Sequence, residues 1–261
     1  MAFSNDTLIG PRIADINLMA IAAGRIIMRN YGSEMEITTK NDKSPVTQAD
    51  IEANNFIVGN LSRITPGIPV ISEEQTANHS QPLTTECFWL VDPLDGTKSF
   101  IRKTGDFTVN IGLVKNRRPV FGVIAVPARG EIYFTDAANR AWKVGNGEKK
   151  EIHVSTPEKD AGFSFVVSHS HHDPETEVYL KNYQVRERKS ASSAYKFCLI
   201  AEGLADIYPR FGQTMEWDTA AGHALVLAAG GTVTGIDGTE FLYAKPGFIN
   251  PGFVVKTAGV L

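Results

Sequence analysis

The sequence predicts an α/β protein, because helix-like and strand-like segments both recur along the chain. Apolar residues recur at helical spacing near the N-terminus, and short apolar runs separated by turn residues follow over residues 68–135. A further alternating series of strand-like and helix-like segments fills residues 163–257. A chain of 261 residues can bury a sizeable core, as one large domain or as two smaller ones.

The first part of the chain predicts two amphipathic helices. Apolar residues recur every three or four positions from Ile13 to Ile27, and Gly32 follows as a typical stop signal. Thr47 and Asp50 have the spacing of a capping box, which predicts a second helix. Its apolar face would include Ile51, Val58 and Leu61.

Apolar runs then predict strands at residues 68–72, 87–91, 107–114, 120–128 and 131–135. Gly145–Gly147 and the charged run after it predict a surface turn. We place a domain boundary near residue 150, with an N-terminal α+β domain over residues 1–150 and a C-terminal α/β domain over residues 151–261. The second part predicts strands at 163–168, 205–211, 231–236 and 252–257, and helices from Ser193 to Glu202 and from Asp218 to Gly230.

Composition narrows the function classes. The net charge is −3, whereas proteins that bind nucleic-acid polymers usually carry a basic excess. Cys87 and Cys198 lie in apolar contexts and are interpreted as buried, reduced thiols. No apolar stretch reaches the ~20 residues of a membrane span, and the first residues lack a secretion-signal pattern. We therefore expect a cytoplasmic protein without a transmembrane segment, and leave open its oligomeric state and contact with the inner face of a membrane.

The stretch WLVDPLDGT, residues 89–97, carries the strongest chemical signal. Asp92 is expected at the C-terminal end of a buried strand, where α/β folds place ligand sites, and Asp95 follows in a turn that ends in Gly96 and Thr97. Two such carboxylates repel each other unless a cation lies between them. Oxygen ligands favour a hard ion such as Mg²⁺, and a helix that begins after Gly96 would offer N–H groups to a phosphate.

Other interpretations of this stretch explain less. An aspartate that caps a helix beside a DG turn accounts for Asp95 but leaves Asp92 without a role. An EF-hand loop that starts at Asp92 would need a glutamate at Lys103. The DxDGT motif of haloacid-dehalogenase-type phosphatases has one residue between its aspartates, whereas Pro93 and Leu94 both lie between these two.

Two further acidic positions are candidates for the same site. Glu73 and Glu74 follow a short apolar strand, and Asp218 begins an apolar helix. Each has a structural alternative, as solvated loop glutamates and as a helix N-cap. Together with Asp92 and Asp95 they would supply the carboxylates of a two-metal site, which holds the attacking and leaving oxygens in phosphoryl transfer.

Three motifs in this order, ISEE, WLVDPLDGTKSF and EWDTAAGHALVLAAGG, resemble the signature segments of the inositol monophosphatase superfamily. Its members are magnesium-dependent, lithium-sensitive phosphatases. The segments KNDKSPVTQAD, GDFTVNIGLV, SSAYKFCLIAEGLADIYPRFG and FINPGF are similar to the superfamily's branch of 3′(2′),5′-bisphosphate nucleotidases, from about residue 40 to 255. The resemblance implies the fold of this superfamily, with alternating layers of helices and sheets.

The resemblance also implies metal ligands. One magnesium would be held by Glu73, Asp92 and the backbone carbonyl of Leu94, and a second by Asp92, Asp95 and Asp218. The cofactor would be two or three Mg²⁺ ions.

The catalytic and substrate-binding residues follow from the same resemblance. Asp50 would accept a hydrogen bond from Thr97, and this pair, with Glu73, would orient and deprotonate the attacking water, so that no phosphoenzyme forms. Gly96 and Thr97 would offer backbone N–H groups to the scissile phosphate. Substrate contacts are implied for Glu73, Leu94, Asp95, Gly96, Thr97, Asp218, Ser192, Ser193 and Lys196.

Lys196 would lie close to the non-scissile 5′-phosphate of a nucleotide, and its structural alternative is an ordinary lysine at a helix start. His169 stands where arginine is usual in these nucleotidases, and histidine is a weaker, pH-dependent phosphate partner. We interpret His169, His171 and His172 as a polar loop rather than a transition-metal site.

The activity implied by the resemblance is hydrolysis of the 3′-phosphate of adenosine 3′,5′-bisphosphate to AMP and phosphate. A second substrate would be 3′-phosphoadenylyl sulfate, and the implied setting is sulfur assimilation. The expected partner is therefore a small phosphorylated nucleotide. Two alternatives stay open: hydrolysis of inositol phosphates or fructose 1,6-bisphosphate, and a non-catalytic magnesium or nucleotide sensor that keeps the acidic pocket.

Overall fold

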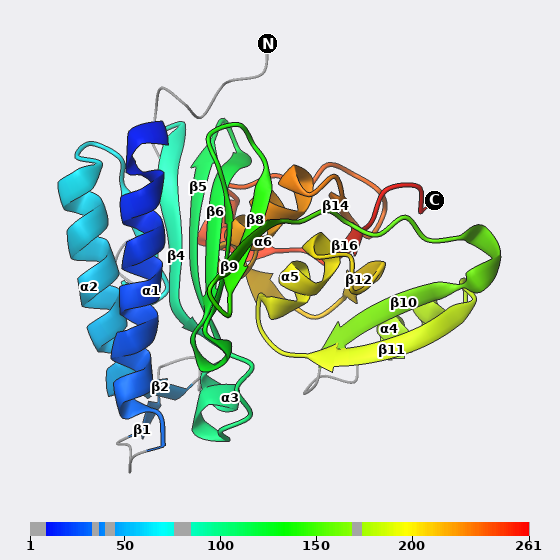
Figure 1. Ribbon diagram of the computed structural model, residues 1–261, viewed down its shortest axis with the longest axis horizontal. Helices are drawn as coiled ribbons and strands as arrows, with labels where there is room; N and C mark the ends of the chain where they lie inside the picture. The colour runs from blue at the N-terminus through cyan, green and yellow to red at the C-terminus, as the bar shows by residue number, and fades with distance from the viewer. Residues whose placement is uncertain (1–8, 33–36, 40–44, 76–84, 169–173, 261) are drawn as a thin grey trace.

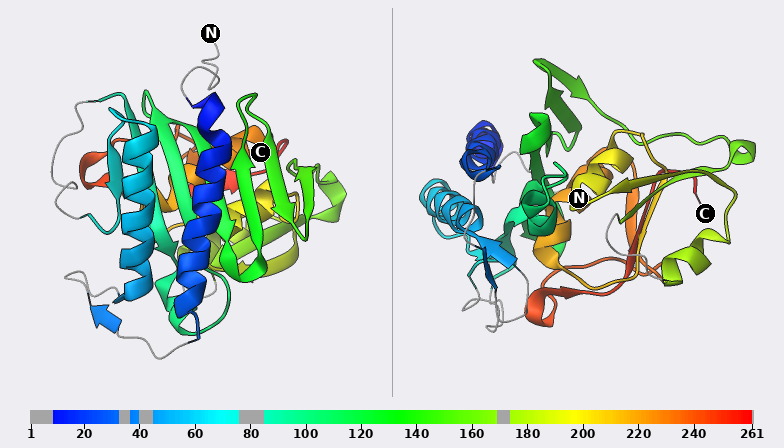
Figure 2. Two further views of the ribbon diagram at one scale, coloured as in Figure 1. Left: turned by 60° about the vertical axis from the view of Figure 1, so that its left-hand side comes forward. Right: turned by 90° about the horizontal axis from the view of Figure 1, so that it is seen from below.

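The computed structural model describes residues 9–32, 37–39, 45–75, 85–168 and 174–260. Helices and sheets alternate in layers across the molecule (Figure 1). Helices α1 (Ile13–Asn30) and α2 (Gln48–Ile64) cover one face of a seven-stranded sheet, and α5 (Tyr195–Ala201) and α6 (Glu216–Ala228) lie on the other. A five-stranded sheet follows, with α4 (Pro174–Leu180) on its far side (Figure 2). The predicted layered α/β class is confirmed.

The two N-terminal helices form where the hydrophobic spacing predicts them. The buried face of α1 runs from Ile13 to Ile27, and it packs with the buried face of α2 in one hydrophobic cluster with the seven-stranded sheet. The predicted capping box starts α2: the Asp50 carboxylate accepts a hydrogen bond from the Thr47 N–H at 2.8 Å. Among the described helices, none has the length and apolarity that would let it cross a bilayer.

The seven-stranded sheet has the order β3-β4-β5-β6-β7-β8-β9, and only the β3–β4 pair is parallel. Its strands are β3 (Val70–Ser72), β4 (Cys87–Asp95), β5 (Thr108–Lys115), β6 (Arg118–Val126), β7 (Glu131–Thr135), β8 (Ala141–Gly145) and β9 (Glu148–Glu151). The first five match the predicted apolar runs. The charged run after Gly147 is strand β9 rather than part of a turn, because an edge strand with exposed side chains needs no apolar pattern.

Strand β4 continues further than the sequence predicts. The expected end at Asp92 is wrong, because pairing with β5 resumes at Asp95, which lies opposite Thr108. Between these two pairs, Pro93 and Leu94 of β4 lie opposite the single residue Val109 of β5, so β4 carries one extra residue there. This is a β-bulge, which bends the strand and redirects side chains. The bulge also accommodates a proline, which cannot donate to the strand ladder.

The five-stranded sheet has the order β11-β10-β12-β16-β14. Its strands are β10 (Phe163–Ser168), β11 (Val185–Ala191), β12 (Ile207–Arg210), β14 (Thr232–Gly235) and β16 (Phe253–Lys256). Two small sheets pair β1 (Ile37–Thr39) with β2 (Pro45–Thr47) and β13 (Thr214–Met215) with β15 (Ile249–Asn250). Short 3₁₀ helices lie at Gly10–Arg12, Pro127–Arg129, Lys159–Ala161 and Pro246–Phe248.

Sequence patterns miss β11 and α4. Most side chains of β11 are exposed or half-buried and many are charged, so this edge strand shows no apolar alternation. The boundary predicted near residue 150 falls between the two large sheets, yet α6 from the second half packs on the first sheet. The division into two domains stays a prediction.

Two paired glycines let α6 approach the seven-stranded sheet closely. Gly112 and Gly122 lie opposite each other on β5 and β6. A Cβ at Gly112 would lie 2.8 Å from the backbone nitrogen of Ala221, and one at Gly122 would collide with the Ala221 carbonyl. The strip without side chains therefore sets the height of α6 above the sheet, and with it the position of Asp218 at the helix start.

Candidate active site

A cavity of about 350 Å³ lies where the start of α6 faces the end of β4 and the start of α5. It brings together the predicted site residues Glu73, Asp92, Leu94, Asp95, Gly96, Thr97, Ser192, Ser193, Lys196 and Asp218. Asp50 is not among the lining residues, but it contacts Thr97. Residues that are far apart in the sequence thus share one site.

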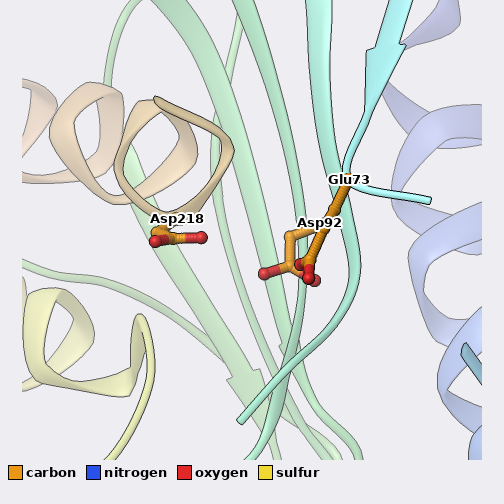
Figure 3. A group of neighbouring side chains, drawn as sticks. All are labelled: Glu73, Asp92 and Asp218. Carbon is orange, nitrogen blue, oxygen red and sulfur yellow. The ribbon is translucent and has the colours of Figure 1, made fainter. Parts of the chain in front are cut away.

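Three carboxylates converge in this cavity (Figure 3). Glu73 follows β3, Asp92 lies on β4, and Asp218 lies in the first turn of α6. One oxygen from each carboxylate lies within 4.8 Å of the other two. Asp92 is buried, with 2% of its surface exposed, while Glu73 and Asp218 are half-buried.

The carboxylates destabilise one another's ionised forms. Burial and repulsion from Glu73, Asp95 and Asp218 raise the pKa of Asp92 well above its usual range. Burial and the charges of Asp95 and Glu73 raise the pKa of Asp218 in the same way. A cation between the carboxylates would remove this repulsion. The donors are oxygens only, which suits Mg²⁺ better than zinc or copper, so the residues fit magnesium.

Asp95 lines the same cavity but also links two elements. Its Oδ2 accepts hydrogen bonds from the Ala194 N–H at 2.7 Å and from the Asn110 amide at 3.2 Å. Burial raises the pKa of Asp95, although the positive charge of Lys196 and these hydrogen bonds oppose the increase. The bulge at the end of β4 is thereby tied to the start of α5.

Thr97 and Asp50 form a contact between α3 (Thr97–Ile101) and the start of α2. The Thr97 hydroxyl lies 3.3 Å from Asp50 Oδ1 and 3.3 Å from the Leu94 carbonyl oxygen. Asp50 Oδ2 accepts hydrogen bonds from the N–H and the hydroxyl of Thr47, at 2.8 and 2.6 Å. Asp50 therefore caps α2 and contacts Thr97 with different oxygens.

Gly96 and Ser193 meet where the end of β4 contacts the start of α5. Gly96 has φ of 92°, a left-handed conformation, and a Cβ there would collide with the Ser193 hydroxyl. The Ser193 hydroxyl donates to the carbonyl oxygens of Asp95 and Asp106, at 2.9 and 3.2 Å. In this structure the hydroxyl therefore binds the backbone of the site, and Ser192 lines the cavity beside it.

Lys196 is a buried cation in the cavity wall, with 4% of its surface exposed. Its Nζ donates to the Ser193 carbonyl at 2.9 Å and lies 5.2 Å from the ring centre of Tyr208. Burial lowers the pKa of Lys196 to about 8, although the negative charge of Asp95 acts in the opposite direction.

A second cation in the cavity, Arg210, escaped the sequence interpretation. It ends β12, and its Nη1 donates to the Ser168 hydroxyl at 2.9 Å. Its Nε is buried and has no hydrogen-bond partner among the described residues. An unsatisfied buried donor of this kind fits an anionic ligand. The signal in the sequence is a basic residue directly after the apolar run ADIYP, at the end of a predicted strand.

The predictions for the three loop histidines fall on residues that the structure does not describe. His169, His171 and His172 lie in residues 169–173, outside the described residues. The metal-ligand, catalytic and substrate roles assigned above likewise stay predictions, although the structure brings their side chains together.

Layered helices and sheets around an acidic cavity define an α/β fold with a candidate divalent-cation site. The model of the inositol monophosphatase family matches residues 12–258, so the chain belongs to this family. Members of the family are magnesium-dependent phosphatases.

Several relatives that are similar over nearly the whole chain carry the name CysQ. A Salmonella typhimurium protein named 3′(2′),5′-bisphosphate nucleotidase CysQ is 45% identical over 241 residues, which cover 91% of this chain and 96% of that protein. Its counterpart in Escherichia coli K12 is 44% identical over 242 residues, with 91% and 96% covered. The crystal structure of CysQ from Bacteroides thetaiotaomicron superposes with a TM-score of 0.81 at 37% identity, covering 94% of this chain and 96% of that one. The resemblance seen in the motifs is confirmed.

Proposed function

We propose that this protein is a magnesium-dependent phosphatase that removes the 3′-phosphate of adenosine 3′,5′-bisphosphate, giving AMP and phosphate. One observation carries the proposal: a single cavity holds three converging carboxylates and two cations, Lys196 and Arg210. Carboxylates suit bound metal ions, and separate cations suit an additional phosphate of the substrate. The relatives named 3′(2′),5′-bisphosphate nucleotidase support the same substrate class.

The metal ligands would be Glu73, Asp92, Asp218, the Leu94 carbonyl and the carboxylate oxygen of Asp95 that does not bind Ala194 and Asn110. When bound, Mg²⁺ lowers the pKa of water and neutralises charge on the transferred phosphoryl group. Two or three ions would fit this role. Asp92 would be the shared ligand, as the resemblance implies, and it is the buried member of the three clustered carboxylates.

Thr97 and Asp50 would orient the attacking water. When the Thr97 hydroxyl donates to Asp50 Oδ1, the lone pairs of its oxygen can accept a hydrogen bond from water. Asp50 would then accept the proton through Thr97, and Glu73 would help to orient the same water. The backbone N–H groups of Gly96 and Thr97 would bind the scissile phosphate.

Arg210 and Lys196 would bind the second phosphate, and Tyr208 and Phe253 would form the wall beside the nucleoside. Arg210 Nε, which finds no hydrogen-bond partner in the part of the chain that the structure describes, would donate to a phosphate oxygen. The same subsite would accept the 5′-phosphosulfate of 3′-phosphoadenylyl sulfate, which is our proposed second substrate.

The proposal is tested by phosphate release from adenosine 3′,5′-bisphosphate, inositol 1-phosphate and fructose 1,6-bisphosphate at equal magnesium concentration. We expect a preference of more than about tenfold in kcat/KM for the nucleotide, or roughly 1.4 kcal/mol of transition-state energy. A preference of that size for inositol 1-phosphate would contradict the proposal and show that the protein hydrolyses inositol phosphates instead. Tight nucleotide binding without turnover of any substrate would support the sensor alternative.

Replacing Arg210 tests the second-phosphate subsite. Arg210→Ala should raise KM for adenosine 3′,5′-bisphosphate by roughly 10- to 100-fold, because a charge-assisted hydrogen bond contributes about 1.5–3 kcal/mol. KM for a substrate with one phosphate should change little. Arg140→Ala, at an exposed arginine that pairs with Asp136 outside the cavity, is the control. Equal losses for both substrates would contradict the assignment.

A further inference from the structure

Asn250, which has no assigned role, lies directly beside the start of α6. It is the last residue of β15 and lies opposite Thr214 of β13, the strand that leads into α6. Its side chain is buried, with 2% of the residue's surface exposed. The motif that contains it, FINPGF, resembles the nucleotidase branch of the family.

The Asn250 amide nitrogen faces three acceptors around the first turn of α6. It lies 2.7 Å from the Met215 carbonyl oxygen, 3.1 Å from the Thr214 hydroxyl and 3.1 Å from the Thr219 hydroxyl. Because a backbone carbonyl only accepts, the contact with Met215 fixes which end of the amide points to the helix. The Asn250 Oδ1 is buried and lacks a hydrogen-bond partner among the described residues. The orientation of the amide leaves Oδ1 without a hydrogen bond among the described residues, which costs free energy, but it lets the amide nitrogen donate to the start of α6.

Met215 connects Asn250 to the metal cluster. The Met215 N–H donates to Asp218 Oδ2 at 2.8 Å, and its carbonyl accepts from Asn250. The same residue is thus held from both sides, by the carboxylate through its N–H and by the amide through its C=O. This bond holds Asp218 Oδ2, and one carboxylate oxygen of Asp218 lies within 4.8 Å of an oxygen of Glu73 and of Asp92.

We infer that Asn250 is a positioning residue for magnesium binding: it holds the Met215 backbone so that the Asp218 carboxylate faces Glu73 and Asp92. This inference rests on the proposed metal role of Asp218. Replacing a group that orients a metal ligand through hydrogen bonds typically costs about 10- to 100-fold in metal affinity or activity. Asparagine suits the position because its two amide hydrogens serve several acceptors without adding a charge.

The test is direct binding of Mn²⁺, a hard ion that stands in for Mg²⁺ and whose free form is counted by EPR. We expect Asn250→Ala and Asn250→Leu to weaken Mn²⁺ binding about 10- to 100-fold. Asn250→Leu keeps most of the side-chain volume but removes the donors, so it separates hydrogen bonding from packing. Val255→Ala is the control, because it truncates a buried side chain on β16 that takes no part in the hydrogen bonds between Asn250, Met215 and Asp218.

Enzyme kinetics give a second readout. The variants should need more Mg²⁺ for half-maximal activity, while KM for the nucleotide at saturating Mg²⁺ stays within about twofold of wild type. If both Asn250 variants bound Mn²⁺ as tightly as wild type, the inference about Asn250 would be overturned, while the proposed function would stand. Equal weakening in Val255→Ala would also overturn it, because general destabilisation would then explain the loss. Absence of Mn²⁺ binding by the wild type would instead contradict the proposed function.

Discussion

At the scale of single residues, the site combines groups that are unfavourable on their own. Asp92 is buried beside three other acidic side chains, and its pKa is raised by burial and by their charges. Arg210 keeps a buried donor that has no partner within the described part of the chain, and burial lowers the pKa of Lys196 to about 8. Destabilised carboxylates and buried cations in one cavity are typical of a binding site. Bound cations would stabilise the carboxylates, and a bound anion would stabilise the two basic side chains.

Asp92→Asn should separate activity from stability. The change should abolish phosphate release, with a loss of about 10³-fold or more, because it removes the negative charge of the carboxylate that we propose to be shared between the metal ions. The same change should stabilise the metal-free protein, because it removes a buried negative charge from among three others. Phosphate release and urea unfolding in EDTA measure the two effects. A variant that is inactive and also less stable without metal would contradict this account.

His223 should make the protein more sensitive to acid. It lies on α6 with 5% of its surface exposed, and burial, with a smaller effect from Lys245, lowers its pKa from 6.5 to about 3. Between these values the unfolded chain binds the proton and the folded protein does not, so stability falls as pH falls through 6.5. From pH 7 to pH 5 this costs about 2 kcal/mol.

The measurement is urea unfolding of wild type and His223→Gln at pH 7 and pH 5. The variant should lose about 2 kcal/mol less than wild type on acidification. The comparison between the two proteins cancels the titration of the carboxylate cluster, which both contain. An equal pH dependence would show that His223 does not lose its proton affinity on folding.

At the scale of elements, the position of α6 decides whether the carboxylates meet. Its first turn carries Asp218, and its middle rests on the glycine pair of β5 and β6. Glu216, fully buried, accepts hydrogen bonds from the N–H groups of Ala244 and Lys245, both at 2.9 Å. The helix is thus fixed against the sheet along its length and against loops at its start.

Gly122→Ala should lift α6 from the sheet. The added methyl group would collide with the Ala221 backbone, so we expect a loss of about 1–3 kcal/mol in stability and a weaker affinity for Mg²⁺. Gly59→Ala is the control: Gly59 lies exposed in α2 with open space around it, and alanine there should stabilise by up to about 1 kcal/mol. Chemical unfolding and Mn²⁺ binding measure both variants. Unchanged metal binding in Gly122→Ala would contradict the link between helix height and the site.

Elements with a strong hydrophobic pattern were predictable from sequence. The periodicity from Ile13 to Ile27 and the capping box of Asp50 located α1 and α2, and the apolar runs located the central strands. The bulge after Asp92 could not be predicted, because it depends on the register with β5. The charged edge strand β11 could not be predicted either. It forms by pairing with β10, and its sequence has no alternation of apolar residues that would indicate a strand.

The site was predictable only in part. The acidic residues that line the cavity could be predicted because they lie in short sequence motifs and because binding a metal ion requires carboxylate side chains at these positions. Arg210 lies in a segment that resembles the nucleotidase branch, but nothing in that segment marks it as a site residue, and its place beside Ser168 and Lys196 follows from the order of strands in the second sheet. Packing of α6 on two glycines likewise depends on side chains that are absent rather than present.

At the scale of the whole molecule, the cavity lies where residues from both halves of the chain meet. Glu73 and Asp92 belong to the first sheet and Asp218 to a helix of the second half, so a bound cation would link the two. A ligand that binds only the folded protein stabilises it by mass action, about 2.7 kcal/mol at 100 times its dissociation constant. Magnesium should therefore stabilise the fold as a whole.

This stabilisation should depend on pH. Because the folded-state pKa values of Asp92 and Asp218 are raised, the metal-free folded protein binds more protons than the unfolded chain above the ordinary pKa of 3.8. The cluster therefore reduces stability as pH rises, and Mg²⁺ offsets this loss. Thermal unfolding should show a larger Mg²⁺-induced rise in Tm at pH 8 than at pH 5. A larger rise at pH 5, or none at either pH, would contradict the account.

The most direct measurement is a crystal structure with Mn²⁺ in place of Mg²⁺, located by its anomalous scattering. The account predicts an anomalous peak between the carboxylates of Glu73, Asp92 and Asp218, with oxygen ligands around it. Active protein whose carboxylates point apart, with no ion between them, would show that the cavity does not work as a metal centre.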